Sequence, residues 1–265
     1  MHRRNILLPK KNTISQSPLI IVEGYSFGQI IIYSFQYDRI PFLESENGEM
    51  VELVLKEFLE GQRGLTQAVF RPSKKLKLRK KYFLKFTEIQ GGFNLSNLTR
   101  YNTEIGENER VAWEVTQRES DILKSGINLE FEKTNVEYSA EGPEANAIFQ
   151  PHHGSESEIW YRAEVYDEQS KSSNIIILTE WQGKLQVGHG ICAGAFKFNK
   201  DGNYKVRFTP MNIDAKELTT TEWTSFESPY KNAVNPFGLD ILKPASDVKH
   251  PIFDALFPSY LYLNC

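Results

Sequence analysis

The two residues most suited to catalysis or metal binding are His189 and Cys192, three positions apart in the run GHGICAGAF. An imidazole and a thiol at short spacing are the side chains of a Cys–His catalytic pair, and both are zinc ligands. With His152 or His153, which precede them in the chain, they would complete a three-residue metal site. The same residues also have a structural explanation, and the two explanations predict different surroundings for His189.

The strand pattern around this pair favours the structural explanation. Leu185, Val187 and His189 alternate along the chain, so His189 is expected to point into a core or to its edge. Glycines at 188, 190 and 194 indicate a bulge or a close approach of two backbones. No CxxC or HExxH motif accompanies the pair. We therefore predict no catalytic residue, no metal and no cofactor, and keep His189 and Cys192 as ligand-binding candidates.

The adjacent histidines His152 and His153 lie in the polar run PHHGSESE. Neighbouring residues on an extended chain point in opposite directions, so the pair makes a poor bidentate site. A solvated loop is the simpler interpretation.

A strongly basic segment covers residues 71–81, RPSKKLKLRKK, with seven Lys or Arg in eleven positions. Such a patch suits phosphate backbones, acidic glycans or lipid headgroups. The structural alternative is an amphipathic edge strand, whose lysines block edge-to-edge aggregation. The segment has no aromatic residue on which bases could stack, so we predict no nucleic-acid partner. Lys75, Lys77 and Arg79 are kept as ligand-binding candidates.

A carbohydrate-binding protein would expose aromatic side chains at loop tips or on one sheet face. Trp160 is the aromatic residue that we keep as a ligand-binding candidate. The other aromatic positions considered are Tyr25, Phe27, Phe93, Tyr101 and Tyr230.

The elements that must position these residues read as short strands separated by turn residues. Met50–Leu59 fits a helix as well, and context favours the strand. Two-residue or Asp-Gly turns at Gln182-Gly183 and Lys200–Gly202 predict two β-hairpins. The main expected strands are Leu19–Glu23, Gln29–Phe35, Met50–Leu59, Thr66–Phe70, Val111–Val115, Asn128–Glu132, Thr134–Tyr138, Ala145–Phe149, Ile159–Tyr166, Asn174–Trp181, Lys184–Val187, Ala195–Phe198, Asn203–Thr209 and Thr220–Phe226.

The two halves of the chain echo one another. YFLKFT from Tyr82 aligns with YKVRFT from Tyr204, and each is followed after a loop by a Trp-bearing strand. A tyrosine that starts a late strand after a polar corner is typical of Ig-like sandwiches, where its phenol ties down the preceding loop. On these residues the chain resembles the tandem immunoglobulin-like or fibronectin type III-like domains of bacterial secreted or surface proteins.

The resemblance implies an all-β fold with two Ig-like β-sandwich domains in tandem. We place the first domain at residues 5–118 and the second at 126–230, with the polar run between them as the boundary. Residues 231–265 are a proline-rich C-terminal extension. It is too apolar for a solvated linker, so we expect it to pack on the domains.

The composition bounds what the protein can do. The 265 residues carry a net charge of -3, which gives no general attraction to nucleic acid or anionic membrane. No apolar run approaches the ~20 residues that span a bilayer, and we predict no transmembrane segment. The opening residues do not read as a secretory signal. The only cysteines are Cys192 and Cys265, which we expect as a buried and an exposed thiol, although one bridge is arithmetically allowed.

These observations favour a non-enzymatic surface or periplasmic module for adhesion, structure, or carbohydrate or protein binding. The alternative is a hydrolase or metal-dependent enzyme on a β-sandwich scaffold, using the His189 and Cys192 region. A third hypothesis is an intracellular module that binds polyanions through the basic segment. We expect an extracellular, cell-surface or periplasmic location, with a cytoplasmic one left open. The sequence indicates no oligomeric state.

Overall fold

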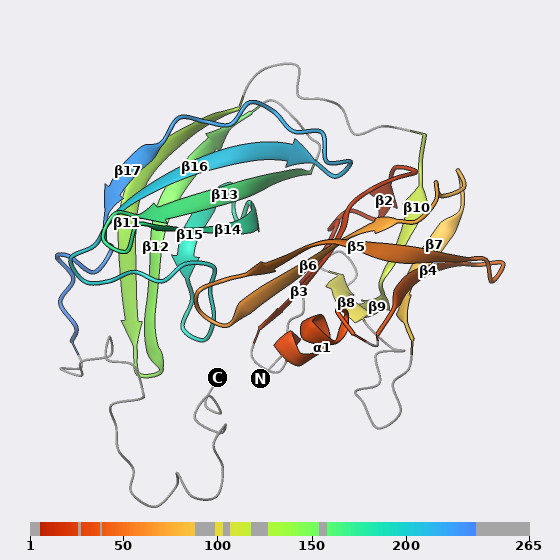
Figure 1. Ribbon diagram of the computed structural model, residues 1–265, viewed down its shortest axis with the longest axis horizontal. Coiled ribbons are helices and arrows are strands. Elements are labelled where there is room, and N and C mark those ends of the chain that lie inside the picture. The colour runs from red at the N-terminus through yellow and green to blue at the C-terminus, as the bar shows by residue number, and fades with distance from the viewer. Residues whose placement is uncertain are drawn as a thin grey trace, which may run out of the picture.

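The computed structural model describes residues 6–25, 28–37, 39–87, 99–102, 107–117, 127–153 and 158–236. Within these ranges the regular structure is β apart from one short helix, α1 (Gly28–Ser34). Figure 1 shows two groups of strands side by side. We name the group of β1 to β10 with α1 module 1, and the group of β11 to β17 module 2. No described helix is both long and apolar enough to cross a membrane.

Module 1 is built on an eight-stranded sheet of order β1-β3-β6-β5-β4-β7-β10-β2. The sheet closes over a core, because Ile20 and Val22 on one side pack in the same apolar cluster as Leu43 and Trp113 on the other. Its strands are β1 (Ile6–Leu8), β2 (Thr13–Ile14), β3 (Ile20–Tyr25), β4 (Pro41–Ser45), β5 (Met50–Glu60), β6 (Leu65–Pro72), β7 (Lys81–Phe86) and β10 (Ala112–Val115). A separate hairpin joins β8 (Thr99–Asn102) and β9 (Glu107–Arg110).

Module 2 has seven antiparallel strands in two sheets. The three-stranded sheet has the order β11-β12-β15 and the four-stranded sheet the order β14-β13-β16-β17. Phe149 and Phe208, one from each sheet, meet with ring centroids 5.0 Å apart in the core between them. The strands are β11 (Asn128–Ser139), β12 (Gly142–His152), β13 (Ile159–Asp167), β14 (Ser172–Thr179), β15 (Leu185–His189), β16 (Asn203–Asn212) and β17 (Thr224–Glu227).

The two modules share one strand order. β1-β3-β6 with β5-β4-β7-β10 corresponds to β11-β12-β15 with β14-β13-β16-β17. The predicted echo is present in atomic detail. The hydroxyl of Tyr82 accepts the N–H of Lys77 at 3.2 Å, and that of Tyr204 accepts the N–H of Asn199 at 2.7 Å. Both phenols thus hold a loop residue five positions upstream, as a tyrosine corner does.

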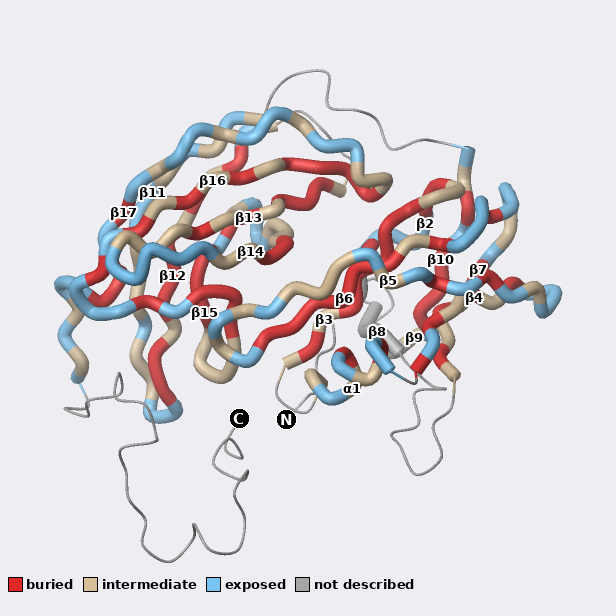
Figure 2. Tube along the Cα trace, viewed as in Figure 1, coloured by how far each residue is buried: buried red, intermediate tan, exposed pale blue. Residues whose placement is uncertain are grey.

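The apolar core of each module includes residues of the other. Trp160, Ile177 and Met211 of module 2 belong to the cluster of module 1, and Leu65 of β6 belongs to that of module 2. In Figure 2 the buried stretches follow β3 and β6 in module 1 and β13 and β16 in module 2. The contact between the modules is therefore desolvated, which favours one fixed orientation.

One element predicted as a strand is a helix. The expected strand Gln29–Phe35 is wrong, since Gly28–Ser34 forms α1. Three consecutive isoleucines suggested a buried strand, but only Ile32 is buried on the helix. The helix lies so close to β3 that a Cβ on Gly24 would meet the carbonyl oxygen of Gly28 at 2.6 Å. Tertiary packing has overridden the β propensity of this run.

The two predicted hairpins are also wrong. Gln182 and Gly183 do form a tight turn with positive φ, but β14 pairs with β13 and β15 pairs with β12, so the strands part into different sheets. The residues before Lys200 form no strand, and the turn there leads into the tyrosine corner. Sequence turn signals were read correctly, whereas strand pairing was not.

Of the other strand predictions, one is confirmed and two need smaller corrections. Met50–Glu60 is a strand, as favoured. The two strands expected between residues 128 and 138 are one strand, β11, with a register shift between Phe131 and Lys133. The closing strand is shorter than expected and begins at Thr224. The C-terminal extension from residue 237 lies outside the described residues.

Candidate functional site

His189 is the last residue of β15 and is almost completely buried, with 3% of its surface exposed. It lies on the same side of the strand as Leu185 and Val187, which are fully buried. The inward orientation predicted from the alternation is therefore confirmed. The ring does not enter a pure apolar core, however, because it lies at the junction of the two modules.

Three polar groups surround the His189 ring. Arg63 Nη1 lies 2.7 Å from Nδ1 and 3.1 Å from Nε2, the Gly190 carbonyl oxygen lies 2.9 Å from Nδ1, and the Tyr230 hydroxyl lies 2.9 Å from Nε2. Since a guanidinium only donates, the ring must keep one unprotonated nitrogen. Burial, with the positive charge of Arg63 as a further cause, lowers the pKa of His189 to about 4. At neutral pH the ring is uncharged.

Arg63 comes from the β5–β6 turn, which docks on the loop after β15. The backbones of Arg63 and Gly194 exchange hydrogen bonds of 3.3 and 2.8 Å, and the Gln62 N–H donates to the Ala195 carbonyl at 2.9 Å. The Gln62 side chain accepts the N–H of Lys197 at 2.8 Å. The junction is thus a short backbone ladder between the modules, and the His189 ring with its polar partners lies next to it.

The glycines around His189 permit this close packing. A Cβ on Gly194 would lie 2.1 Å from the Cβ of His189, and one on Gly188 would lie 2.0 Å from the carbonyl oxygen of Ala145. On the opposite side, a Cβ on Gly61 would lie 2.7 Å from the carbonyl oxygen of Gly194. The close approach predicted from these glycines is confirmed at Gly188 and Gly194, whose neighbours lie within module 2, and not at Gly190; Gly61 of module 1 packs against Gly194 from the other side.

Cys192 is half-buried and disulfide-bonded, so the expected free thiol is wrong. The only other cysteine of the chain, Cys265, lies outside the described residues. A sulfur in a disulfide is neither a thiolate nucleophile nor a zinc ligand. Among the residues described, no three His, Cys, Asp or Glu side chains gather where they could hold a metal ion.

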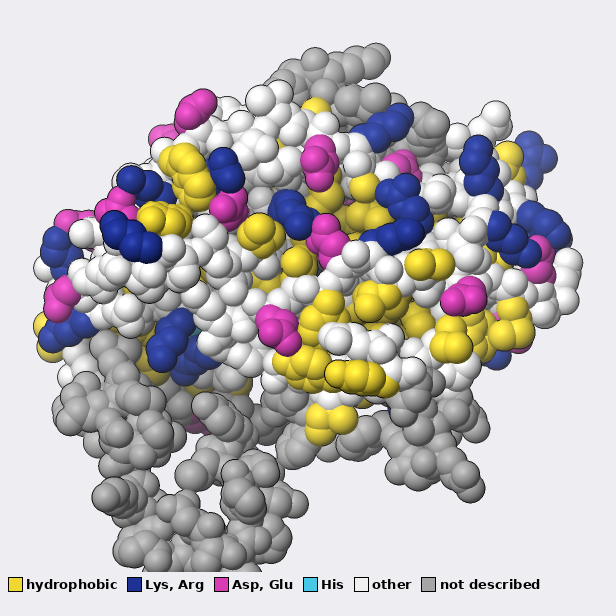
Figure 3. Space-filling view, viewed as in Figure 1, with side chains coloured by type: hydrophobic (Ala, Val, Ile, Leu, Met, Phe, Trp, Pro, Cys, Tyr) yellow, Lys and Arg dark blue, Asp and Glu magenta, His cyan; other side chains and the backbone are white. Residues whose placement is uncertain are grey.

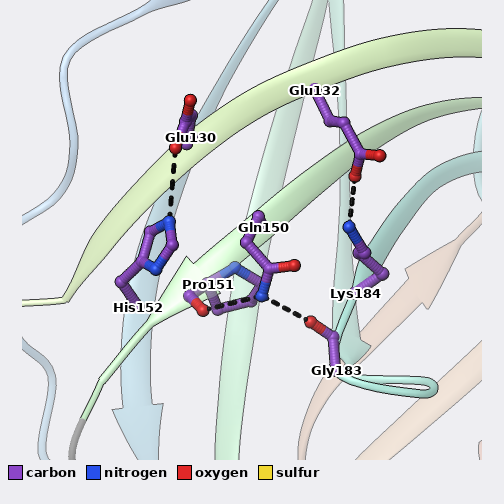
Figure 4. A network of polar contacts seen from close by, with 7 residues as sticks. All are labelled: Glu130, Glu132, Gln150, Pro151, His152, Gly183 and Lys184. Atoms are coloured by element: carbon purple, nitrogen blue, oxygen red, sulfur yellow. Dashed lines mark hydrogen bonds and ion pairs between the residues drawn. The ribbon is translucent and has the colours of Figure 1, made fainter.

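The adjacent histidines make separate contacts, as expected for residues that point in opposite directions. His152 is exposed and lies 3.3 Å from Glu130 of β11 (Figure 4). His153 lies 2.8 Å from Glu180, which also accepts the Tyr161 hydroxyl at 2.7 Å. Neither histidine contacts His189 in the interactions described.

Figure 4 shows that the surroundings of His152 are a surface network. Gln150 donates to the carbonyl oxygens of Pro151 and Gly183, at 3.1 and 3.0 Å. Lys184 pairs with Glu132 of β11. Exposed ion pairs of this kind contribute little to stability, and the arrangement offers no enclosed site.

The basic segment is not the amphipathic edge strand that its alternation suggested. β6 ends at Pro72 and β7 begins at Lys81, and the residues between them form a loop. Leu76 is buried at 1% while Leu78 is 39% exposed, so the two leucines do not share one face of a strand. The candidates Lys75, Lys77 and Arg79 are all exposed on this loop.

Trp160 is fully buried rather than exposed at a loop tip. Its indole N–H donates to Glu158 at 2.9 Å, and its ring packs in the shared core. Tyr230 is buried beside His189, and Tyr25 is half-buried. Phe27, Phe93 and the side chain of Tyr101 lie outside the described part of the structure.

A shallow depression of about 180 Å³ lies on the outer face of the four-stranded sheet. Its two guanidinium groups are already paired, because Arg207 binds Glu164 at 2.6 Å and Arg162 binds Glu57 at 2.7 Å. The Arg207 guanidinium also lies over the Trp223 ring, 4.5 Å from its centroid. The depression is lined by Arg162, Glu164, Ile175, Arg207, Thr209 and Thr220.

Sequence reasoning missed the partners of His189. Arg63 lies in the turn between Gly61 and Gly64, for which we predicted no role, and Tyr230 was considered only as an exposed aromatic. No local pattern links positions 63, 189 and 230, because Tyr230 meets His189 only in the folded module 2 and Arg63 meets it only when the modules pack. An arginine between Gly61 and Gly64 was the one available signal of a close approach.

The comparisons with known proteins are distant. No family model and no curated protein matches the chain. Among solved structures, it is similar to a pullulanase from Anoxybacillus sp. LM18-11, with 11% identity and a TM-score of 0.22 over 80% of this chain and 24% of that chain. The complex of the pullulanase with maltotriose gives 10% identity, a TM-score of 0.23 and the same coverage.

A chain of a cytokine receptor complex, crystal form 1A, gives 9% identity and a TM-score of 0.26, over 80% of this chain and 92% of that chain. This chain spans about a quarter of the pullulanases. TM-scores this low carry no argument about fold or activity. The fold stands on the strand order: a mostly β protein with several sheets.

Proposed function

We propose that this protein is a non-enzymatic binding or structural module, built from two Ig-like or fibronectin type III-like sandwiches packed as one body. The shared strand order and the two tyrosine corners support the tandem arrangement. The proposed functional classes are adhesion and recognition of a protein or carbohydrate.

The observation that carries this proposal is the use of His189 at the junction. A catalytic base needs an accessible nitrogen and a pKa near the working pH. The His189 ring is enclosed by Arg63 and Tyr230, and its pKa is lowered to about 4. With Cys192 in a disulfide, the two most reactive side chains of the sequence serve architecture.

The disulfide also supports the proposed location. Disulfides persist in extracellular, cell-surface and periplasmic proteins and are rare in a reducing cytosol. Cys192 is bridged in a chain with only two cysteines. This bond supports the proposal that the protein acts outside the cytoplasm.

A protein partner is supported by the apolar face of module 1. Ile30 and Tyr33 of α1 are 52% and 39% exposed, and the nearby Tyr37 and Ile40 are 84% and 49% exposed. Figure 3 shows hydrophobic side chains gathered over α1 and β5. Contiguous exposed apolar surface of this kind marks interaction sites on soluble proteins.

The test compares wild-type protein with His189→Gln and with Lys200→Gln, an exposed control. Each is incubated with chromogenic ester, glycoside and peptide substrates, and bound zinc is measured by elemental analysis. The expected result is no turnover and no stoichiometric zinc. The proposal would be contradicted if the wild type and Lys200→Gln turned over a substrate and His189→Gln did not. One bound zinc per chain would also contradict it.

A further inference from the structure

The loop between β6 and β7, residues 73–80, concentrates positive charge on a protein whose net charge is -3. We call it the basic corner; five of its eight residues are Lys or Arg. Glu49 pairs with Lys74 at 3.1 Å and with Lys77 at 2.7 Å. Lys75, Arg79 and Lys80 form no ion pair with any described residue. Three cations are left uncompensated.

The backbone of the basic corner is held at several points. Leu76 is buried, and its N–H donates to a carbonyl of the β2–β3 connection at 2.8 Å. The Lys77 N–H donates to the Tyr82 hydroxyl, which is the tyrosine corner of module 1. The Arg79 N–H donates to the Val115 carbonyl at 2.8 Å, and the Val115 N–H donates back to Lys80 at 2.9 Å. The cations therefore project from a preorganised frame, which reduces the entropy lost on binding.

These cations have no task in the fold that the structure shows. Lys75 and Arg79 are exposed, and Arg79 adopts φ 57°, a left-handed conformation that costs free energy for a residue with a side chain. Like charges on one rigid loop also repel each other. A loop that keeps unpaired cations together, despite their repulsion and the left-handed backbone at Arg79, is suited to binding a multivalent anion.

We infer that the basic corner is a docking surface for an acidic polysaccharide, whose sulfate or carboxylate groups engage Lys75, Arg79 and Lys80. This inference rests on the proposed function and names its partner class. In Figure 3, Lys and Arg side chains gather at the end of module 1 beyond β4 and β5. Anionic groups repeated along a hydrophilic chain match several unpaired cations carried by one loop.

Nucleic acid and membrane fit the surface less well. The loop carries no aromatic side chain, the Tyr82 ring beside it is buried, and Phe83 already has Lys81 and Arg110 over its ring at 5.6 and 4.8 Å. Base stacking therefore has no open platform. Leu78 is the one exposed apolar side chain of the corner, which is little for insertion into lipid.

The test uses a triple variant with Lys75→Gln, Arg79→Gln and Lys80→Gln. The matched control is Lys133→Gln, Lys171→Gln and Lys200→Gln, three exposed lysines of module 2. Both variants lower the net charge by three. Both also change one residue with positive φ, since Lys171 (φ 58°) matches Arg79 (φ 57°). Binding of dextran sulfate, polygalacturonate, neutral dextran, double-stranded DNA and phosphatidylglycerol vesicles is measured at low and at physiological salt.

Wild type and control are expected to bind dextran sulfate or polygalacturonate in a salt-sensitive way, and the triple variant at least about tenfold more weakly. The two polymers distinguish sulfate from carboxylate. Equal weakening in both variants, or no binding to either polymer at low salt, overturns the inference. Tighter binding of DNA or vesicles overturns the partner class.

The outcome is separable from that of the proposed function. Loss of polysaccharide binding with no enzymatic turnover removes the docking surface and leaves a non-enzymatic module. Cleavage of the bound polymer, seen as new reducing ends, removes the proposed function and leaves the docking surface in place.

Discussion

The two modules follow one strand order but differ in one connection, between β5 and β6 in module 1 and between β14 and β15 in module 2. In module 1, β5 and β6 form a long hairpin in which β5 also pairs with β4, so the ladder continues around the sheet. In module 2, β14 and β15 are separated by the turn at Gln182-Gly183 and enter different sheets. The two sheets are therefore joined on this side in module 1 and separate on the same side in module 2.

This difference determines how the modules are joined. The long hairpin of module 1 carries Gln62 and Arg63 beyond its own core and onto the loop after β15. That loop is the counterpart, in module 2, of the basic corner in module 1. One corner is glycine-rich and contacts the neighbouring module, whereas the other is exposed and basic. The two modules therefore share their strand order and their corner tyrosines and differ in the loops that precede these tyrosines.

The largest expected effect comes from breaking the docking of the hairpin. Gly194→Ala would place a Cβ 2.1 Å from the Cβ and 2.3 Å from the Cα of His189. The backbone must shift to relieve this clash, and the ladder to Arg63 is lost with it. We expect a loss of about 4 kcal/mol in the free energy of unfolding, measured by urea denaturation.

The control for this substitution is Gly190→Ala in the same loop. Its Cβ would meet only the carbonyl oxygen of Ala193, at 3.6 Å. We expect a change below about 1 kcal/mol. If both variants were equally stable, the close approach of Gly194 would not be needed for docking.

The next effect is the pH dependence that His189 contributes. Its pKa is lowered to about 4 in the folded protein, from 6.5. The unfolded chain therefore takes up a proton at a higher pH than the folded chain, and stability falls as the pH falls from about 6.5 to 4. The contribution is full above pH 6.5, and up to about 3 kcal/mol of it is lost by pH 4.

The variant His189→Gln isolates this contribution, because glutamine keeps a donor and an acceptor but does not titrate in this range. Unfolding free energies of both proteins are measured between pH 4 and 7.5. The difference between the two curves should change across that window. Parallel curves would mean that the ring titrates normally and is not enclosed by Arg63.

The sequence predicted most strands because alternation and turn residues are local signals. It predicted the corner tyrosines Tyr82 and Tyr204 for the same reason, since each phenol binds a residue only five positions away. The helix α1 was missed because three consecutive isoleucines have no unambiguous period. Whether β14 and β15 pair depends on contacts with β13 and β12, which no local pattern records.

The candidate site was predicted only in part, for a physical reason. The inward direction of His189 follows from strand alternation, whereas Arg63 reaches it across 126 positions of sequence. Trp160 was interpreted as an exposed aromatic because burial at a junction between modules leaves no mark on the strand itself. Lys75 and Arg79 were proposed from charge alone, which is independent of the surrounding fold, and they stay a prediction.

A smaller effect is expected at the second link between the modules. Gln67 is fully buried; its amide donates to the Ile177 carbonyl at 2.8 Å and accepts the Ile177 N–H at 3.0 Å. Gln67→Leu leaves both backbone groups buried without a partner, at a cost of about 2 kcal/mol. Gln67→Glu keeps the acceptor and serves as a second variant. Thermal unfolding of both should show a lower midpoint, and unchanged midpoints would mean that water replaces the amide.

The smallest effects compare the two corners directly. Tyr204→Phe and Tyr82→Phe each remove one hydroxyl from a buried ring and leave one loop N–H without its acceptor. We expect a cost of about 1 kcal/mol for each. The 2.7 Å bond to Asn199 should cost more to lose than the 3.2 Å bond to Lys77. Amide hydrogen exchange at Asn199 and Lys77 measures each corner separately, and exchange in Tyr82→Phe should quicken at Lys77 alone. If it quickened at both positions, the corners would be coupled through the shared core and would not be two independent copies of one device.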